Sequence, residues 1–478
     1  MESKGPAGGK RPGAGTSAAE PAHWPGFSIA RLPRIMFGSG TAGQLGSVVR
    51  EFGRKALVVV RGPSFTGSTD WVRLLAALET AGVDVAVESV SGEPSPEVVD
   101  GIVARHRLSG AEIGAGSGAG GRAESSPGGT SSRGTGPTPI EVVVGIGGGS
   151  VLDTAKAVAG LLVPGNSVMD HLEGVGPELQ YRGPSLPFIA VPTTAGTGSE
   201  ATKNAVVSSR GAGGFKKSFR DERLVAQVAI LDPDLLAACP PELIAGNGMD
   251  ALTQLLESYV STRANPFTDA LALSGLGCIR DGLQTWFEEA QTGRDGGRPN
   301  GRLGGRPGGK AADPSSSAAR QGSVAAVARE RMAYAALCSG ICLAQAGLGA
   351  VHGLASPLGA QFPIPHGVAC GATLVAATRI NIAALEARDP ENRALNRYAV
   401  AGWLFSGRAG GDDREARSAL VPALEGLTAR LAVPRLSAFG ITEASIPAIL
   451  ADSRGSSMKT NPIVLTDDEI AAILRESL

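Results

Sequence analysis

The feature that most constrains the fold of this chain is an alternation of short apolar runs and helical patterns in its first half. The apolar runs are Lys55–Val60, Val83–Val90, Ile140–Ile146 and Pro187–Val191. Helical patterns cover Asp70–Ala81 and Pro96–Arg105. Continuous apolar strands separated by helices are typical of a parallel sheet that is covered on both faces. The first half therefore predicts an α/β domain of the nucleotide-binding type.

The second half, from about Pro240, carries almost no strand pattern. Its long amphipathic segments at Leu243–Val260, Pro266–Ala290 and Val324–Ala346 predict a helical domain. We therefore expect an α/β domain over residues 23–238 and an all-α domain over residues 239–478, with a cleft between them.

Three tracts have a composition that differs from both halves. Residues 1–22, 112–138 and 291–322 are rich in Gly, Pro, Ser, Ala and Arg and show no apolar period. Such segments cannot bury enough apolar surface to offset the loss of chain entropy. We expect a disordered tail at the N-terminus and a disordered insertion in each domain.

Charge and cysteine content exclude some classes of partner. Lys plus Arg (44) balance Asp plus Glu (45), so no basic excess suggests binding to nucleic acid or to an anionic membrane. No apolar run reaches the roughly 18 residues that a bilayer span needs, and the N-terminus lacks the apolar region of a signal peptide. Five Cys, an odd number, fit a reducing compartment. We expect a cytoplasmic protein.

A glycine-rich turn at the end of one predicted strand indicates a phosphate-binding site. Gly147, Gly148, Gly149 and Ser150 directly follow the strand that ends at Ile146, and a helical pattern begins after them. Glycines at such a turn let backbone N–H groups approach a pyrophosphate, and the helix N-terminus adds positive potential. A tight turn with a Ser cap is the alternative reading.

A second loop follows the strand Pro187–Val191 and reads P-T-T-A-G-T-G-S-E. The hydroxyls of Thr193, Thr194 and Thr197 suit ribose and adenine edges better than they suit packing. By contrast, Gly38–Gly43 matches G-x-G-x-x-G, but the next strand ends in Arg61 where a ribose-binding acid would stand. We expect this third turn not to bind phosphate.

A group of potential metal ligands lies in the helical half. Asp250 and Gln254 are four positions apart and so share one helix face. His352 and His366 are two of only five His in the chain, and each stands before a Gly in an apolar region. An Asp, two His and an amide carbonyl together favour a divalent-metal site over ordinary packing.

Five motifs, in this order, resemble those of the iron-containing (group III) alcohol dehydrogenases. They are G-G-G-S-x-x-D-x-A-K, P-T-T-A-G-T-G-S-E, G-M-D-A-L-T, G-L-G-A-V-H-G and P-H-G-V-A. The resemblance covers about residues 27 to 478. It implies a Rossmann-like N-terminal domain that binds a dinucleotide, an all-α C-terminal domain of the dehydroquinate synthase-like fold, and a cleft for NAD(P) and one Fe²⁺ or Zn²⁺.

The resemblance also implies roles for single residues. The family's metal ligands, an Asp and three His, fall on Asp250, Gln254, His352 and His366. Its cofactor loops fall on Gly147, Gly148, Gly149, Ser150, Thr193, Thr194 and Thr197, and its cofactor-binding Lys falls on Lys216. Asp153 matches a family residue near the nicotinamide, which makes it a candidate catalytic residue.

Two departures from the family pattern concern the metal and the proton. Gln254 stands where most relatives have His, so we expect lower metal affinity, a preference for harder cations, or a three-ligand site open to water. Ser356 stands where many relatives have a His that is thought to shuttle the alcohol proton. A hydroxyl there can relay a proton through water but cannot store one.

The expected activity is reversible hydride transfer between a small alcohol and its aldehyde or ketone, linked to NAD(P) and dependent on the metal. Relatives strict for NAD tend to carry Asp at the position of Arg61, so we expect NADP(H) to be accepted. A cyclase or polyol-phosphate dehydrogenase on the same scaffold and a catalytically inactive scaffold protein are the alternatives. The sequence leaves open whether the chain forms a homodimer.

Overall fold

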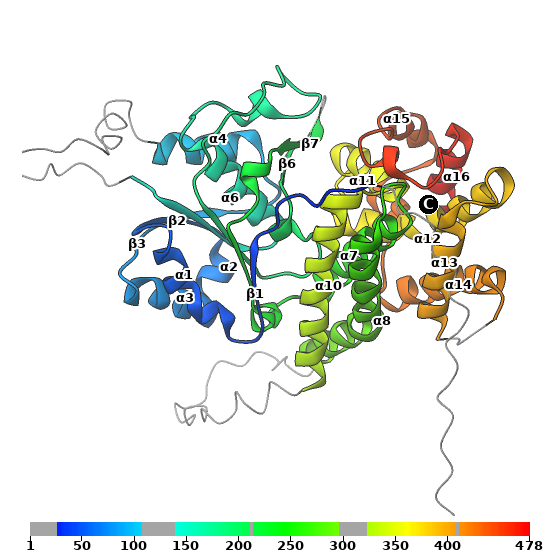
Figure 1. Ribbon diagram of the computed structural model, residues 1–478, viewed down its shortest axis with the longest axis horizontal. Helices are drawn as coiled ribbons and strands as arrows, with labels where there is room; N and C mark the ends of the chain where they lie inside the picture. Colours follow the sequence, from blue (N-terminus) through cyan, green and yellow to red (C-terminus); the bar gives the residue numbers. More distant parts are fainter. Residues whose placement is uncertain (1–25, 108–138, 211–213, 296–322, 408–410) are drawn as a thin grey trace, which may run out of the picture.

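The computed structural model describes residues 26–107, 139–210, 214–295, 323–407 and 411–478. They form an α/β lobe and a helical lobe that lie side by side (Figure 1). The tracts 1–22 and 112–138 lie outside the described residues. Of the tract 291–322, the described part is residues 291–295, and these continue a helix instead of beginning a disordered insertion.

One parallel sheet organises the α/β lobe. Its strands follow the order β1-β8-β5-β4-β2-β3, and every neighbouring pair is parallel. The strands are β1 (Arg34–Phe37), β2 (Lys55–Arg61), β3 (Asp84–Val90), β4 (Val142–Gly147), β5 (Phe188–Pro192) and β8 (Val228–Leu231). The predicted parallel sheet is thus confirmed, with strand bounds that shift by one or two residues.

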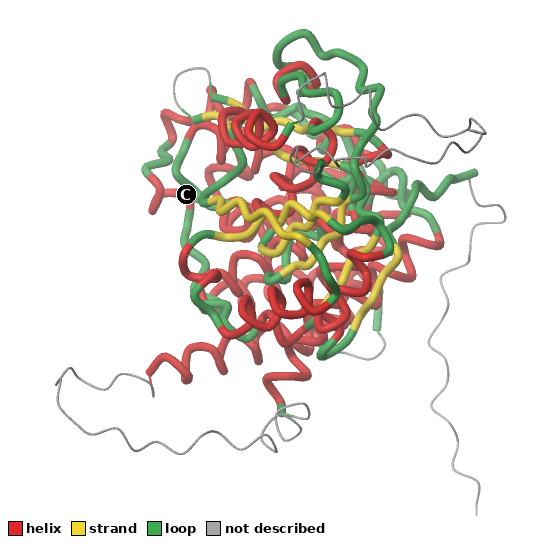
Figure 2. Tube along the Cα trace, turned by 90° about the vertical axis from the view of Figure 1, so that its left-hand side faces the viewer, coloured by secondary structure: helices red, strands yellow, loops and turns green. Residues whose placement is uncertain are grey.

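Helices cover both faces of this sheet, as Figure 2 shows for the strands and the helices on either side of them. Alternate residues of β2 point to opposite faces: Leu57 and Val59 pack in one core, while Ala56, Val58 and Val60 pack in the other. The first core includes α4 (Pro96–His106) and α6 (Gly149–Leu161), and the second includes α1 (Leu45–Arg50) and α3 (Thr69–Thr80). A short helix, α2, spans Pro63–Thr66.

An antiparallel hairpin, which the sequence analysis did not predict, lies where the α/β lobe faces the helical lobe (Figure 1). It consists of β6 (Asn204–Ser209) and β7 (Phe215–Arg220). Its strands mix polar and apolar residues, N-A-V-V-S-S and F-K-K-S-F-R, so they lack the continuous apolar pattern of the sheet strands. This hairpin brings Lys216 toward the space between the lobes.

The helical lobe confirms the predicted all-α half. The predicted helix Val324–Ala346 has the same bounds as α10, and the other two predicted helices extend by a few residues. The remaining helices are α7 (Pro241–Val260), α8 (Pro266–Asp295), α11 (Ala350–Gln361), α12 (His366–Arg388), α13 (Arg393–Ser406), α14 (Asp413–Arg430), α15 (Ile446–Ala451) and α16 (Asp467–Ser477). Short 3-10 turns span Thr41–Gln44, Val168–His171, Ser199–Ala201, Glu222–Leu224, Pro233–Leu236, Leu436–Phe439, Glu443–Ser445 and Met458–Thr460.

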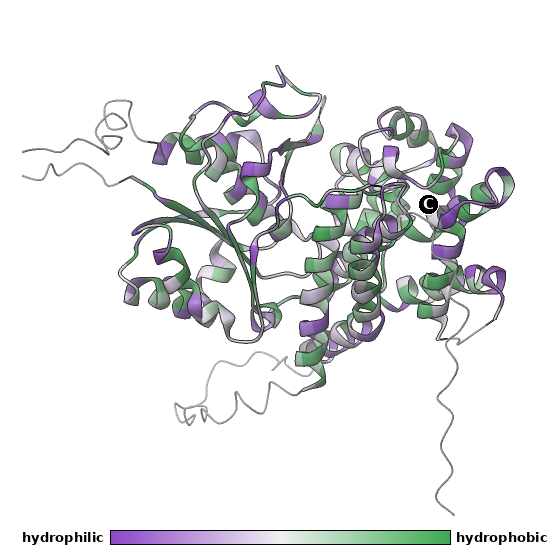
Figure 3. Ribbon diagram, in the orientation of Figure 1, coloured by the Kyte–Doolittle hydropathy of each residue, from purple (hydrophilic) through white to green (hydrophobic). Residues whose placement is uncertain are grey.

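The centre of the helical lobe is formed by helices that are apolar on nearly all sides. Almost every residue of α7 from Ile244 to Val260 is buried, and Figure 3 shows apolar residues along the central helices and along the strands of the sheet. By length and hydropathy α12 would be able to cross a bilayer, but 72% of its apolar window is buried inside the protein, as in a core helix.

Candidate metal and cofactor site

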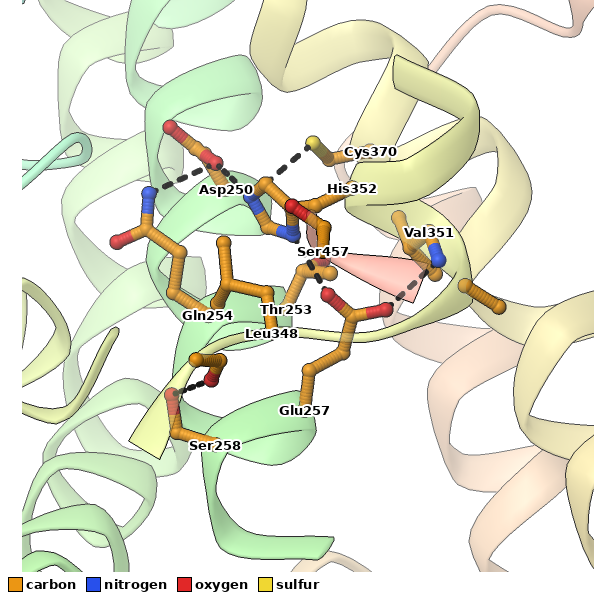
Figure 4. A network of polar contacts seen from close by, with 12 residues as sticks. Asp250, Thr253, Gln254, Glu257, Ser258, Leu348, Val351, His352, Cys370 and Ser457 are labelled. Carbon is orange, nitrogen blue, oxygen red and sulfur yellow. Dashed lines mark hydrogen bonds and ion pairs between the residues drawn. The ribbon is translucent and has the colours of Figure 1, made fainter. Parts of the chain in front are cut away.

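Three helices of the helical lobe bring the predicted metal ligands together, and Figure 4 shows Asp250, Gln254 and His352 among them. Asp250 lies in the buried middle of α7, His352 is in the first turn of α11, and His366 begins α12. A bend of 101° between α10 and α11 turns the chain back toward α7. Gly347 occupies the left-handed region at φ +75 in this bend, a conformation that glycine adopts at little cost.

Both imidazoles face the carboxylate of Asp250. The Nε2 of His352 lies 3.2 Å from Asp250 Oδ1, and the Nε2 of His366 lies 3.7 Å from the same oxygen. Asp250 and His352 are almost fully buried, whereas 28% of the His366 side chain opens to a cavity. Three of the four predicted ligands are therefore close enough to share one ion.

Gln254, the fourth predicted ligand, lies beside this group with its amide oxygen turned away from it. Its Nε2 donates a hydrogen bond to Asp250 Oδ1 at 3.1 Å. Its carbonyl oxygen accepts a hydrogen bond from Ser339 Oγ in α10 at 2.7 Å. The oxygen that was expected to bind the metal is thus engaged with a neighbouring helix, and this arrangement does not support the expectation.

The structure adds a cysteine that the sequence analysis did not select. Cys370 Sγ lies 3.7 Å from His352 Nε2 and 3.9 Å from His366 Nε2. One potential ligand atom from each of Asp250, His352, His366 and Cys370 lies within 4.8 Å of all the others. The spacing of four residues between His366 and Cys370 could have indicated this cysteine in the sequence, since residues i and i+4 share a helix face.

A second residue absent from the sequence-based prediction, Glu257, orients His352. Its Oε2 lies 2.7 Å from His352 Nδ1, and its Oε1 accepts a hydrogen bond from the backbone N–H of Val351 at 2.7 Å. Metal-binding His residues commonly donate their second ring N–H to a carboxylate in this way, which fixes the tautomer and the ring orientation. The spacing of seven residues between Asp250 and Glu257 on one helix could have indicated, from the sequence, that both lie on the same helix face.

The charges of the group fit a divalent cation. Burial opposes ionisation of Asp250, but the facing rings of His366 and His352 outweigh it and hold its pKa below the usual value. Burial lowers the pKa of His366 to about 4, so this ring is neutral at pH 7 and keeps a free lone pair. Metal binding needs deprotonated ligands of this kind. Asp250 and His366 meet this condition at pH 7. Burial opposes a charge on His352, but Cys370, Asp250 and Glu257 outweigh it and raise its pKa above the usual value, so this ring must release a proton when a metal binds.

The two predicted cofactor loops lie against each other at the carboxyl ends of β4 and β5. The backbone N–H of Thr193 donates to Gly147 O at 3.0 Å, and a Cβ on Gly148 would meet the side chain of Thr194. A Cβ on Gly149 would lie 2.6 Å from Thr197 Cγ2, which is closer than real contacts allow. Ligands of open parallel sheets bind at this edge, and glycine here lets the two loops approach each other closely.

One cavity between the lobes joins the cofactor turn to the metal group. Among the residues singled out from the sequence, its lining includes Gly149, Ser150, Asp153, Thr197, Lys216, Asp250, Gln254, His352, Ser356 and His366. Ser356 is exposed to it. The glycine turn and the predicted metal ligands therefore face one space.

The remaining predicted residues of the α/β lobe have definite partners. Lys216 Nζ lies 2.8 Å from Glu93 Oε1. Asp153 accepts hydrogen bonds from Ser199 Oγ at 2.5 Å and from the backbone N–H of Val206 at 3.1 Å, and burial raises its pKa. Asp153 thus holds the second cofactor loop and the hairpin while lining the cavity.

A fully buried lysine, to which the sequence analysis assigned no role, supports the same region. Lys156 Nζ donates to Ser199 O at 2.8 Å, Ser199 Oγ at 3.0 Å, Thr202 Oγ1 at 3.0 Å and Asn204 O at 2.6 Å. A buried ammonium group is tolerated only when its donors are satisfied. Lys156 therefore ties helix α6 to the segment that connects the second loop with β6.

Arg61 ends β2 and is exposed at the same sheet edge as Gly147. The third glycine turn, at Gly38–Gly43, is closed by a carboxylate of the chain itself. Asp232 accepts hydrogen bonds from the N–H groups of Gly40 and Ala42, both at 3.1 Å. These amides are already paired, in keeping with the expectation that this turn does not bind phosphate.

Comparison with known proteins gives a consistent result along the chain. The family model "Iron-containing alcohol dehydrogenase" matches residues 33–122 and 136–233, and "Fe-containing alcohol dehydrogenase family, C-terminal" matches residues 317–478. Alcohol dehydrogenase 4 of Saccharomyces cerevisiae is 31% identical over 339 residues, which cover 70% of this chain and 76% of that protein. The 1-propanol dehydrogenase PduQ of Salmonella typhimurium is 32% identical over 346 residues, which cover 71% and 78%.

Solved structures share the fold over nearly the whole chain. The crystal structure of a 1,3-propanediol oxidoreductase has a TM-score of 0.72 and 25% identity, and the match covers 95% of this chain and 100% of that one. An alcohol dehydrogenase from Oenococcus oeni has a TM-score of 0.73 and 24% identity, with 95% and 100% covered.

Proposed function

The chain belongs to the iron-containing alcohol dehydrogenase family, and from this premise we propose that Asp250, His352 and His366 hold its divalent metal ion opposite the cofactor turn at Gly147–Ser150. The protein is an oxidoreductase that interconverts alcohols and aldehydes by hydride transfer. The observation that carries the proposed site is the shared cavity, which is lined both by Gly149 and by the three potential ligands.

The residues of the cavity have separate tasks in this proposal. A bound divalent cation supplies Lewis-acid polarisation of the substrate oxygen. Asp250 contributes the negative charge that balances the cation, and His352 is held in place by Glu257. The glycine turn and Thr197 bind and orient the dinucleotide, which sets the hydride-transfer distance. Ser356, exposed to the cavity, passes the alcohol proton to water.

We propose that the dinucleotide site accepts NADP(H) as well as NAD(H). Names of relatives differ in this respect, since one is an NAD-dependent methanol dehydrogenase of Bacillus methanolicus and another an NADPH-dependent butanol dehydrogenase of Clostridium saccharobutylicum. Support comes from Arg61, the last residue of β2. This strand pairs with β4, which leads to the glycine turn. An Arg at this position can pair with a 2′-phosphate.

For the substrate we propose a small uncharged alcohol and its aldehyde, with Fe²⁺ or Zn²⁺ as the metal. The names of propanol, butanol and methanol dehydrogenases among the relatives support a short-chain alcohol. A cytoplasmic location, from the cysteine content and the charge balance, is part of the same proposal.

Three cations of β7 line the cavity, and the family resemblance assigned one of them, Lys216, to the cofactor. They are Lys216, Lys217 and Arg220. Two of them are paired with acids of the same cavity, because Lys216 contacts Glu93 at 2.8 Å and Arg220 contacts Glu173 at 3.0 Å. This pairing leaves little reason to favour a phosphorylated or carboxylated substrate.

The test is a metal-reconstitution assay. Protein treated with a chelator should lose NAD(P)H-dependent reduction of propanal and butanal, and added Fe²⁺ or Zn²⁺ should restore it. His366→Ala should remain inactive after metal addition, whereas the control His106→Ala, altered at a His that contacts Glu88 outside the cavity, should recover. Full activity in the chelated protein would refute the metal site.

A further inference from the structure

The sulfur of Cys370 completes the group of potential ligands around Asp250. Cys370 is fully buried, and it lies one helical turn after His366 on α12. Its Sγ is 3.7 Å from His352 Nε2 and 3.9 Å from His366 Nε2. Cys370 packs in the apolar core of the helical lobe and does not line the cavity, but its sulfur also faces two ring nitrogens, which a purely apolar position would not offer.

The distances match the edges of a coordination tetrahedron. Metal–N and metal–O bonds of about 2.0–2.1 Å and metal–S bonds of about 2.3 Å place tetrahedral ligand atoms roughly 3.3 to 3.6 Å apart. The group has edges of 3.2 and 3.7 Å from Asp250 Oδ1 to the two rings, and of 3.7 and 3.9 Å from the sulfur to the same rings. The other two pairs, Cys370 Sγ with Asp250 and one ring with the other, lie within 4.8 Å, so the four atoms would have to close by up to about 1 Å to share one ion.

Gln254 does not compete for this fourth position. Its carbonyl oxygen accepts a hydrogen bond from Ser339 at 2.7 Å, and its amide nitrogen, which cannot bind a metal, is the atom that faces Asp250. With the amide turned around, Nε2 could still donate to Ser339 Oγ, but the carbonyl oxygen would then lie against the Asp250 carboxylate, so the orientation with Nε2 toward Asp250 is favoured.

We propose that Cys370 binds the metal as a thiolate. It takes the place of the family histidine at whose position this chain has Gln254. On binding, the S–H bond breaks, a metal–sulfur bond forms, and the proton passes to the buffer. This inference rests on the proposed function, since it assumes a metal at Asp250, His352 and His366. A thiolate is a soft ligand and favours Zn²⁺ or Fe²⁺ over Mn²⁺ and Mg²⁺, which reverses the harder-cation preference expected from Gln254.

The first test uses the unaltered protein loaded with Zn²⁺. Zinc K-edge X-ray absorption should show one sulfur at about 2.3 Å beside nitrogen and oxygen ligands at about 2.0–2.2 Å. A first shell made only of nitrogen and oxygen would overturn the role of Cys370 while leaving the metal site itself intact. Failure to bind zinc, iron or cobalt at all would overturn both the inference and the proposed metal site, so the two failures are distinguishable.

The second test compares three variants loaded with Co²⁺, after circular dichroism has confirmed that each is folded. Cys370→Ser should lose the thiolate-to-cobalt charge-transfer band in the near ultraviolet, and its Zn²⁺ affinity should fall more than about 100-fold, beyond the 10- to 100-fold loss typical of outer-shell changes. Cys338→Ser removes another buried cysteine, in α10, and should keep the band. Gln254→Ala should keep it as well. A band that persists in Cys370→Ser would refute the proposal.

Discussion

Glu257 and His352 stand 95 positions apart in the chain, and their side chains meet at 2.7 Å inside the helical lobe. The carboxylate contacts Nδ1, so the other ring nitrogen, Nε2, points at Asp250. Glu257 also binds the backbone of Val351 and so holds the first turn of α11. Through these two contacts Glu257, which does not touch the proposed metal position, sets the orientation of His352, a proposed ligand.

Replacing Glu257 should therefore weaken metal binding without removing a ligand. We expect Glu257→Gln to lower Zn²⁺ or Fe²⁺ affinity by about 10- to 100-fold, the usual effect of losing a carboxylate behind a metal-bound His. Competition with a chromophoric chelator measures the affinity. Glu386→Gln, on the surface of α12 at a contact with Arg417, is the control and should bind metal normally. Equal affinities for the two variants would contradict this role.

Adding one methyl group at the cofactor turn should weaken dinucleotide binding. Gly149→Ala would place its Cβ 2.6 Å from Thr197 Cγ2, so Thr197 must move into the space where the pyrophosphate is proposed to bind. We expect the Kd for NAD(H) or NADP(H), measured by fluorescence titration, to rise tenfold or more (about 1.4 kcal/mol). Gly43→Ala, in the third glycine turn, meets nothing within 4 Å and should leave the Kd unchanged. A normal Kd for Gly149→Ala would exclude this turn as the phosphate site.

The charge at the end of β2 should decide between the two dinucleotides. Arg61→Asp replaces a cation that can pair with a 2′-phosphate by an anion that repels it. A charge-assisted hydrogen bond contributes about 1.5–3 kcal/mol, so the ratio of kcat/KM for NADH to that for NADPH should rise about 10- to 100-fold. If the ratio does not move, Arg61 is a solvated strand-end residue.

The hydroxyl of Ser356 should contribute little to the rate, because water can replace it as a proton relay. We expect Ser356→Ala to lower kcat by less than about tenfold, which is small against the 100-fold or more of a true general base. Ser356→His introduces a group that ionises near pH 6.5. The pH profile of kcat should then gain a limb in that range, and a profile identical to that of the unaltered enzyme would show that position 356 does not handle the proton.

Glu200 should make the folded protein less stable as the pH rises. Burial raises its pKa from 4.5 to about 7, so between these values the folded state holds a proton that the unfolded state has lost. The stabilising contribution is complete below pH 4.5 and disappears as the pH passes 7. Relative to Glu200→Gln, the free energy of unfolding of the unaltered protein should fall by about 2 kcal/mol from pH 5 to pH 8. Urea denaturation measures this free energy for both proteins. A difference between them that stays constant across this pH range would contradict the prediction.

Much of the fold could be predicted because it depends on patterns within single segments. The bounds of α10 agree with the predicted Val324–Ala346, since a long Ala-rich run without Pro is visible along the segment itself. The hairpin β6–β7 was missed because neither of its strands forms a continuous apolar run. Its position depends on contacts such as those of Lys156 with Ser199 and Asn204, which join segments more than forty positions apart.

The candidate site, too, could be predicted from the sequence only in part. Residue type and motif context were enough to select Asp250, His352 and His366, because these two His are the only ones in the helical half and Asp250 belongs to the motif G-M-D-A-L-T. The same reasoning selected Gln254 in preference to Cys370 and passed over Glu257, although Glu257 follows Asp250 by seven positions on one helix. Which of these side chains turns toward the ion depends on how α7, α11 and α12 pack, and no local pattern contains that information.

The amino-acid order alone was sufficient to predict the two-lobe architecture and the family and to propose a metal site and a dinucleotide site, since apolar periodicity and motif spacing are properties of short stretches of chain. The orientation of the Gln254 amide toward Ser339 and the approach of the Cys370 sulfur to both imidazoles became apparent only in the packed molecule. Metal-ligand geometry is set to within tenths of an ångström by helices that meet from distant parts of the sequence.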